Sequence, residues 1–259
     1  MLPTLLLKLT LVAASVLLAS LAAKRFGHAV GGTLAGLPMI AGPIMGFVLL
    51  QASVQDVRDI ALATLVCLPA TVVHLLVFAW SALRWRWPVS LLLANLAFFA
   101  AGALLALLPL PPVLACGLAL AALALGAAAM PRLPVRPGAV AIPRLELVCR
   151  VAVAVLVAWL IMRSAGVAPA AVSGLLLAVP IAGNVLPCFT LPQHGAAATV
   201  ALLRGFVHGL TGFAAFFVVL WLGLGQWREG SAYAAAWVAA LVGASGLSAW
   251  QQRRMARAA

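Results

Sequence analysis

Acidic residues are scarce in this sequence. Only four Asp and Glu residues stand against 16 Lys and Arg, and charged residues make up 8% of the 259 positions. No carboxylate falls in the middle of a long apolar stretch. This absence argues against a series of Asp and Glu side chains that relays protons through a membrane, although a histidine is still able to titrate.

The sequence also lacks the signatures of common catalytic and metal centres. It has no phosphate-binding Gly-x-x-x-x-Gly-Lys loop, no His-Glu-x-x-His helix and no Gly-x-Ser-x-Gly turn. Four isolated cysteines lie within or at the ends of apolar segments and form no Cys-x-x-Cys pair: Cys67, Cys116, Cys149 and Cys188. We expect small buried thiols, no cofactor, no metal site and no enzymatic activity.

Apolar residues are abundant instead. The chain is 66% hydrophobic, and its mean hydropathy is +1.20. Several apolar runs reach the roughly 20 residues that cross a bilayer as a helix, and none shows the alternation of a membrane barrel. The sequence predicts an all-α polytopic membrane protein whose nine spans run roughly over residues 2–23, 30–50, 57–80, 88–108, 112–130, 143–163, 168–190, 197–222 and 232–250.

The formal net charge of +12 comes from basic residues in the short loops between these spans. In that position they set topology and meet lipid headgroups, so we expect membrane lipids as partners and no nucleic acid. If the chain crosses the membrane nine times, the basic residues on one side of the membrane are Lys24, Arg25, Arg84, Arg86, Arg132, Arg136, Arg144, Arg253, Arg254 and Arg257. The other side receives Arg58, Arg163 and Arg228. The positive-inside rule then predicts a membrane protein with its N-terminus outside and its C-terminus in the cytoplasm.

Tryptophans fall at the depths that this topology predicts. Trp80, Trp85, Trp87 and Trp250 gather at the cytoplasmic interface, and Trp221 and Trp227 lie at the opposite one. The first span has an alternative interpretation as a signal peptide, because residues 20–23 form a small-residue pattern. It lacks a basic leading region, and Lys24 and Arg25 follow it directly, so we interpret it as a true span.

One motif occurs twice. The run Leu-Pro-Met-Ile-Ala-Gly-Pro at 37–43 returns as Val-Pro-Ile-Ala-Gly-Asn at 179–184. Pro38 matches Pro180 at an offset of 142 residues, and the same offset relates the phenylalanines at 47 and 189 and the glutamines at 51 and 193. Five spans precede the Pro-rich basic linker, and an odd number inverts the second half in the membrane. The predicted domains are a first repeat over 1–130, a cytoplasmic linker over 131–142 and a shorter second repeat over 143–259.

Both copies of the motif lie inside predicted spans, where Pro and Gly interrupt the helical hydrogen-bond ladder. In span two these residues are Pro38, Gly42 and Pro43. In span seven they are Pro180, Gly183 and Asn184, followed by Pro187. Paired broken helices mark the binding site of many transporters. The predicted substrate-binding residues in these spans are therefore Pro38, Gly42, Pro43, Pro180, Gly183 and Asn184. A kink that improves helix packing is the alternative interpretation.

Span eight adds Arg204 and His208 as predicted substrate-binding residues. With Thr211 they lie on one helical face, and an arginine within a membrane usually faces a partner or a cavity. The alternative is that Arg204 reaches the nearby headgroups. Gly205 and Gly209 predict a close contact between helices.

Other polar residues receive local interpretations. In span three, Thr71 and His74 share a helical face and predict hydrogen bonds between helices. Glu146 and Arg150 are spaced to form an ion pair along span six.

The motif Gly36-Leu37-Pro38 with Ala41-Gly42-Pro43, Phe47 and Gln51 resembles a family of bacterial multi-pass inner-membrane proteins that has no established activity. The runs at 202–205 and 213–217 are similar as well. The resemblance implies a location and no substrate. The five-span inverted plan is analogous in architecture to bile-acid-type secondary carriers, and architecture alone does not fix function.

These features favour a small secondary transporter or facilitator. Its solute would be small and anionic or zwitterionic, because Arg204 and His208 flank the broken helices. The alternative is a non-transporting membrane protein, an assembly partner or a lipid-interacting scaffold, whose repeat is inherited architecture.

Overall fold

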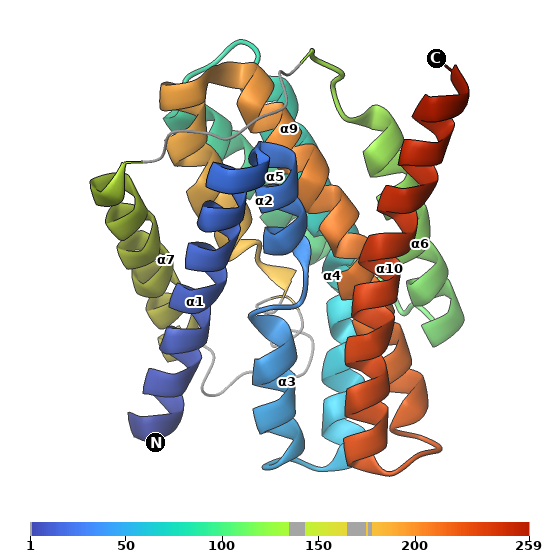
Figure 1. The fold of residues 1–259 in the computed structure, drawn as a ribbon. Helices are drawn as coiled ribbons and strands as arrows, with labels where there is room; N and C mark the ends of the chain where they lie inside the picture. Colours follow the sequence, from blue (N-terminus) through green and yellow to red (C-terminus); the bar gives the residue numbers. More distant parts are fainter. Residues whose placement is uncertain (1, 135–142, 165–174, 176–177, 259) are drawn as a thin grey trace.

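The computed structural model describes residues 2–134, 143–164, 175 and 178–258. Within them every regular element is a helix (Figure 1). The helices are α1 (Leu2–Phe26), α2 (His28–Gly36), α3 (Ala41–Leu49), α4 (Val54–Ser81), α5 (Trp87–Ala106), α6 (Pro112–Ala129), α7 (Arg144–Ser164), α9 (Ile181–Gly223) and α10 (Glu229–Ala258). Most of the predicted linker, and the first part of predicted span seven, lie outside the described residues.

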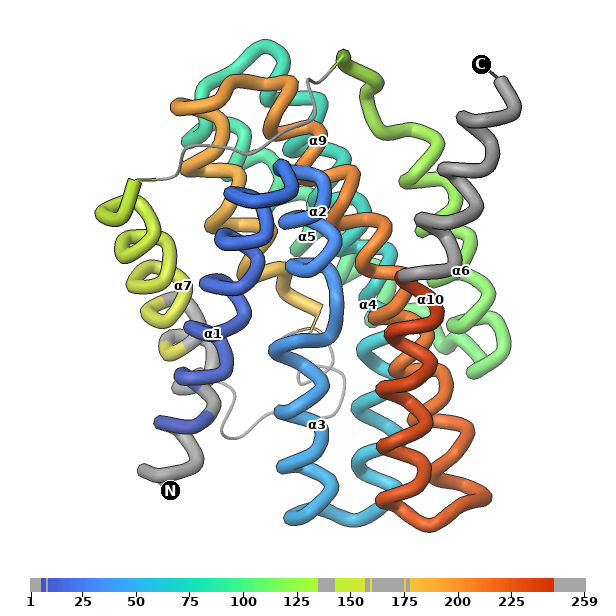
Figure 2. The backbone as a smooth tube through the Cα atoms, viewed as in Figure 1, coloured from blue at the N-terminus to red at the C-terminus, as the bar shows by residue number. Residues whose placement is uncertain are grey.

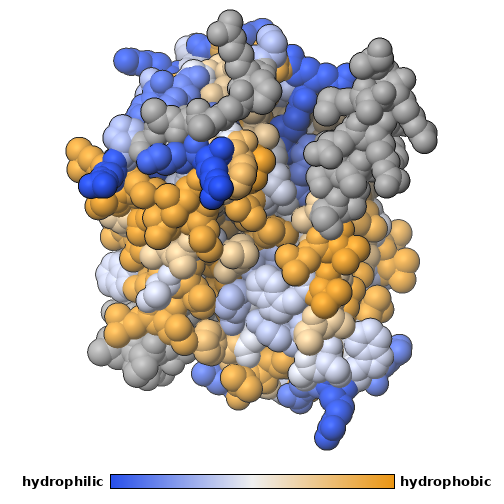
Figure 3. All heavy atoms as spheres, in the orientation of Figure 1, coloured by the Kyte–Doolittle hydropathy of each residue, from blue (hydrophilic) through white to orange (hydrophobic). Residues whose placement is uncertain are grey.

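In the described part of the chain, six helical stretches are long and apolar enough to cross a membrane: Leu9–Phe26, His28–Leu49, Val54–Ser81, Trp87–Ala106, Pro112–Ala129 and Ile181–Gly223. Large apolar side chains cover the outside of the bundle, among them Leu96 and Phe99 on α5 and Leu125 on α6. Figure 3 shows this apolar surface as a broad band with hydrophilic residues toward its two ends. The protein is a multi-pass helical membrane protein, as the sequence predicts.

Helix ends follow from local chemistry. Ser53 and Asp56 form a capping box at the start of α4, in which the Ser53 hydroxyl accepts from the Asp56 amide at 3.1 Å. α9 consists of two helical parts that meet at Gly195, whose φ of 77° is easily adopted only by glycine. We call residues 181–194 the first part of α9 and residues 196–223 the second part.

Helix bounds recur at the offset of 142 residues that the motif shows. α1 begins at residue 2 and α7 at 144, while α5 begins at 87 and α10 at 229. α4 covers 54–81, and the second part of α9 covers 196–223. Figures 1 and 2 show the members of two such pairs running in opposite directions: α1 ascends while α7 descends, and α2 with α3 descends while the first part of α9 ascends.

The closest helix contact joins α2 to the second part of α9. A Cβ on Gly205 would overlap the carbonyl oxygen of Ala29, and one on Gly32 would overlap that of Leu202. Gly209 packs in the same way against Thr33. The predicted contact at Gly205 and Gly209 is confirmed, and it holds the two backbones as near to each other as glycine allows.

α4 lies inside the bundle. It packs against α5, α6 and α9 (Figure 2). Leu65, Leu68, Leu75 and Phe78 on this helix are fully buried. Because α4 is enclosed on several sides, its polar side chains must find partners inside the protein.

Replacement of Gly205 by Val should destabilise the protein, because the added atoms overlap the α2 backbone. We expect a loss of about 1–3 kcal/mol, the usual cost of overpacking, visible as a lower melting temperature in detergent. Gly117→Ala on α6 is the control, since a Cβ there meets no atom within 4 Å. Equal melting temperatures for the two variants would contradict the close contact.

Candidate functional site at the interrupted helices

The two predicted interruptions are present and share one backbone pattern. Between α2 and α3 the Met39 amide donates to the Leu37 carbonyl, and the Gly42 amide donates to the Pro38 carbonyl, both at 2.7 Å. Before α9 the Ile181 amide donates to the Val179 carbonyl at 2.9 Å, and the Asn184 amide donates to the Pro180 carbonyl at 2.7 Å. Each donor and acceptor in the second break lies 142 residues after its counterpart in the first.

Both interruptions end earlier in the chain than the sequence predicts. Gly42 and Pro43 already belong to the first turn of α3, where a proline is tolerated because the first amides of a helix have no partner within it. Gly183, Asn184 and Pro187 lie inside the first part of α9. Among the described residues at these places, those that depart from helix are 37–40 and 179–180.

The first interruption is covered by aromatic side chains of α10. The Tyr233 hydroxyl donates to the Gly42 carbonyl at 3.1 Å. The indole of Trp237 lies so close to Gly42 that a Cβ there would overlap it. These contacts close the first break with apolar rings and one hydroxyl.

The second interruption is met by polar side chains. The hydroxyl of Thr71 on α4 donates to the Ala178 carbonyl at 2.7 Å in a buried position. This carbonyl lies just before Pro180, where the helix breaks, and lipid has no group to satisfy it. The predicted hydrogen bond between helices at Thr71 is therefore confirmed.

Asn184 also has a partner from another helix. The side-chain amide of Asn95 on α5 donates to the Asn184 side-chain oxygen at 3.0 Å and to the Leu91 carbonyl at 2.9 Å. Sequence reasoning missed Asn95. The signal was an amide inside an otherwise apolar span, a residue type that rarely faces lipid.

His74 lies beside these groups and is fully buried. Its ring packs edge-on against Phe98, with centroids 6.3 Å apart, and interacts with the backbone of Ala94 and Gly183. In the part of the chain that the structure describes, neither ring nitrogen has a partner that meets hydrogen-bond geometry. We call Thr71, His74, Asn95, Asn184 and the Ala178 carbonyl the break cluster.

A second polar group surrounds Arg150 on α7, which is only 1% exposed. Arg150 forms the predicted ion pair with Glu146, and this pair is buried rather than at the surface. The guanidinium lies 3.5 Å from the Thr190 hydroxyl and 5.8 Å from the ring centre of Phe189, both on α9. The pair thus joins α7 to the first part of α9.

Two histidines that sequence reasoning did not consider complete this group. The rings of His28, at the start of α2, and His194, at the end of the first part of α9, have centroids 4.9 Å apart. Four buried atoms here have no partner among the residues that the structure describes: Nδ1 of His28, Nε2 of His194, Oε2 of Glu146 and Nε of Arg150. We call His28, Glu146, Arg150, Thr190 and His194 the charged cluster.

Arg204 and His208 lie apart from both clusters. The Arg204 guanidinium donates to the carbonyls of Met130 and Pro131, at 3.1 and 2.7 Å, and so caps the end of α6. Its Nε is buried, with no hydrogen-bond partner in the described ranges. His208 lies one turn further along α9, and the Thr211 hydroxyl donates to its carbonyl at 2.7 Å.

The eight predicted site residues therefore fall into three places. Pro180, Gly183 and Asn184 lie at the break cluster; Pro38, Gly42 and Pro43 lie at the first interruption; and Arg204 and His208 lie nearer the end of α6. Among the described residues, no group of three or more His, Cys, Asp or Glu side chains is placed to hold a metal ion.

Comparison with known proteins gives no further assignment. No protein-family model, curated protein or solved structure matches the chain. The class of protein is thus defined by the fold and the site: a multi-pass membrane protein with polar side chains gathered where one of its helices is interrupted.

The Glu146–Arg150 pair generates a stability prediction. Glu146→Gln or Arg150→Gln alone leaves an uncompensated charge in the bundle and should cost about 3–5 kcal/mol. The double variant Glu146→Leu with Arg150→Met should recover most of that loss, because no charge then remains to be solvated. Thermal unfolding in detergent measures both effects.

Arg144→Gln is the matched control, since Arg144 is an exposed residue at the start of the same helix. It should change stability by less than about 0.5 kcal/mol. If the single variants at 146 and 150 behave like this control, the pair is not buried in the folded protein.

Proposed function

We propose that this protein is a small secondary transporter or facilitator that carries a small anionic or zwitterionic solute across the bacterial inner membrane. One observation carries the proposal. Two interrupted helices have the same backbone hydrogen bonds at an offset of 142 residues and run in opposite directions (Figure 1). Broken helices in corresponding places of inverted halves form the solute site of many carriers.

The proposed topology has nine spans in two inverted repeats, with the N-terminus outside and the C-terminus cytoplasmic. The recurring helix bounds of α1 with α7, α4 with the second part of α9, and α5 with α10 support the repeat. The excess of basic residues on one side supports the orientation, and the resemblance to bacterial inner-membrane proteins supports the choice of membrane.

The proposed solute path follows one face of the first part of α9. Gly183, Pro187, Thr190 and His194 are separated by four, three and four residues, so they lie on a single helical face. This face begins at the break cluster and ends at the charged cluster. Pro187 lacks an amide hydrogen, which leaves the Gly183 carbonyl without its helical donor at the start of the path.

The charged cluster supports the solute class. The Arg150 Nε–H and the two imidazoles offer unpartnered nitrogens to a carboxylate or similar anion, and the free oxygen of Glu146 offers an acceptor to a cationic group. A zwitterion would use both. Arg204 and His208 lie on the second part of α9, apart from both clusters, so a role for them in this proposal requires that the solute also pass near the end of α6.

A non-transporting scaffold or assembly partner is the second candidate. It is favoured by the covering of the first interruption by Tyr233 and Trp237, and by the use of Arg204 to cap α6. In that case both breaks serve packing, and water does not reach them.

Water access to Asn184 distinguishes the two candidates. In a background without the four native cysteines, Asn184→Cys should react with a membrane-impermeant maleimide, because a thiol ionises and reacts only where water reaches it. Modification is read by a mass shift in intact cells and in inverted vesicles.

Two controls frame this measurement. Leu186→Cys replaces a side chain that is 1% exposed and should stay unmodified, and Leu96→Cys places a thiol on the apolar outer surface and should also react poorly. No reaction at position 184 from either side of the membrane would refute a solute path through the break cluster.

Arg204→Ala separates solute binding from helix capping. If Arg204 contacts the solute, the variant raises KM by tenfold or more, the effect of removing a charged hydrogen bond of about 1.5–3 kcal/mol. Arg204→Lys keeps the charge and should restore part of the affinity. A lower melting temperature with an unchanged KM would limit Arg204 to capping α6.

A further inference from the structure

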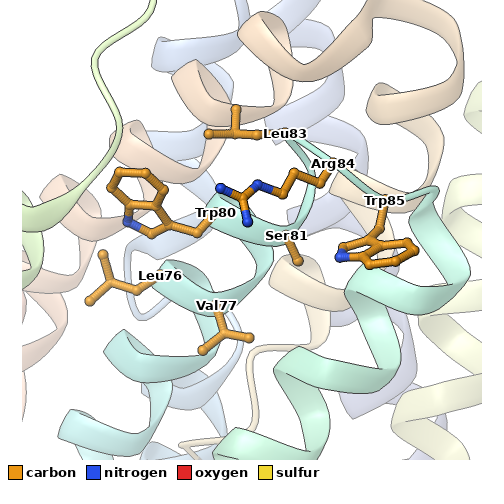
Figure 4. A pocket seen from close by; sticks show the side chains of 7 residues that line it. All are labelled: Leu76, Val77, Trp80, Ser81, Leu83, Arg84 and Trp85. Carbon is orange, nitrogen blue, oxygen red and sulfur yellow. The ribbon is translucent and has the colours of Figure 1, made fainter.

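A cavity of about 430 Å³ lies at the C-terminal end of α4 and shares no lining residue with either polar cluster. It is lined by Leu76, Val77, Trp80, Ser81, Leu83, Arg84 and Trp85. Figure 4 shows the Arg84 guanidinium between the indoles of Trp80 and Trp85, with Leu76 and Val77 below it. The cavity thus joins a cationic group to an apolar floor.

Among the residues that the structure describes, the Arg84 guanidinium has no hydrogen-bond or ion-pair partner. Trp80 is held in place, because its indole N–H donates to the Ala129 carbonyl of α6 at 3.1 Å. A fixed aromatic wall therefore stands beside a free cation.

Both indoles face the surroundings of the bundle: Trp80 is 55% exposed and Trp85 is 57% exposed. Exposed indoles at the end of an apolar helix mark the depth of the lipid headgroups. At this depth a phospholipid presents its phosphate and, just below it, its acyl chains. The phosphate is complementary in charge to the Arg84 guanidinium, and the acyl chains are complementary to the apolar side chains of Leu76 and Val77.

The corresponding end of α9 is an internal comparison. The turn after α4 closes with the Trp85 amide on the Ser81 carbonyl at 2.8 Å, and the turn after α9 closes with Trp227 on Gly223 at 2.7 Å. Gln226 stands there in the place of Arg84.

The guanidinium near that second turn is already used. Arg58 donates through Nε to the Trp221 carbonyl at 3.2 Å and lies over the Trp221 ring at 5.7 Å. The end of α4 therefore differs from the end of α9 in having beside its cavity an arginine, Arg84, with no hydrogen-bond or ion-pair partner among the described residues.

We propose that the cavity at the end of α4 binds one anionic phospholipid, whose phosphate pairs with Arg84 and whose acyl chain lies on Leu76 and Val77 between the indoles. The site does not depend on transport. It lies at one end of the bundle, so it selects lipid from one leaflet.

Native mass spectrometry of the full chain, released from detergent micelles that contain phosphatidylglycerol or phosphatidylcholine, tests the site. The wild-type protein should bind phosphatidylglycerol about fivefold more tightly than phosphatidylcholine. This ratio corresponds to about 1 kcal/mol, the contribution of one arginine near an anionic headgroup. Arg84→Gln should remove this preference. Arg86→Gln removes an equal charge two residues away, outside the cavity lining, and should leave the preference within about twofold of wild type.

A second variant tests the apolar floor. Val77→Phe fills the cavity without changing the charge and should weaken retention of phosphatidylglycerol, while the melting temperature without lipid reports that the fold is intact. Equal losses for Arg84→Gln and Arg86→Gln, or retention unchanged by Val77→Phe, would overturn a site built by this cavity. Displacement of the lipid by inorganic phosphate alone would also overturn it, because a free anion would then be the ligand.

Discussion

The constraint on which this structure depends is that every backbone polar group within an apolar bundle needs a partner from the protein. An unbroken helix meets this need by itself, and the breaks at 37–40 and 179–180 do not. Each break is therefore positioned where side chains from other helices reach it. Tyr233 of α10 supplies a hydroxyl to the first, and Thr71 of α4 supplies one to the second. The arrangement of α4 and α10 around the breaks follows from this requirement.

Close packing holds these donors in place. Gly205 and Gly209 bring the second part of α9 against α2, so the short helix that precedes the first break cannot shift without backbone overlap. On the other side of the bundle, Arg150 ties α7 to Thr190 on the first part of α9. Because lipid offers no hydrophobic driving force between helices, such close glycine contacts and buried polar bonds provide much of the association. The same contacts fix the geometry of the proposed solute path.

How much of this could be predicted from sequence depends on whether the signal is local. Helical spans follow from hydropathy, and the breaks at Pro38 and Pro180 follow from proline chemistry, which acts on the residues nearest to it. The predicted extent of the breaks is wrong, because Pro43 and Pro187 both lie within helices in the structure. Asn95 and the pairing of His28 with His194 depend on which helices become neighbours, and no pattern along one helix contains that information.

The two interruptions have the same backbone hydrogen bonds, but different side chains cover them. This difference bears on how a carrier would use them. If both breaks were packed alike, the two halves of the bundle would be equivalent and neither side would be favoured. Here α10 closes the first break with the rings of Tyr233 and Trp237. At the second break the partners are instead the polar side chains of Thr71 and Asn184, and Asn184 is partly exposed. The first part of α9 runs from there to the charged cluster, where four buried polar atoms have no partner among the described residues. In the proposed inverted-repeat carrier this asymmetry makes the first half the gate and the second half the binding surface, because among the described residues the second break has more polar side chains beside it than the first.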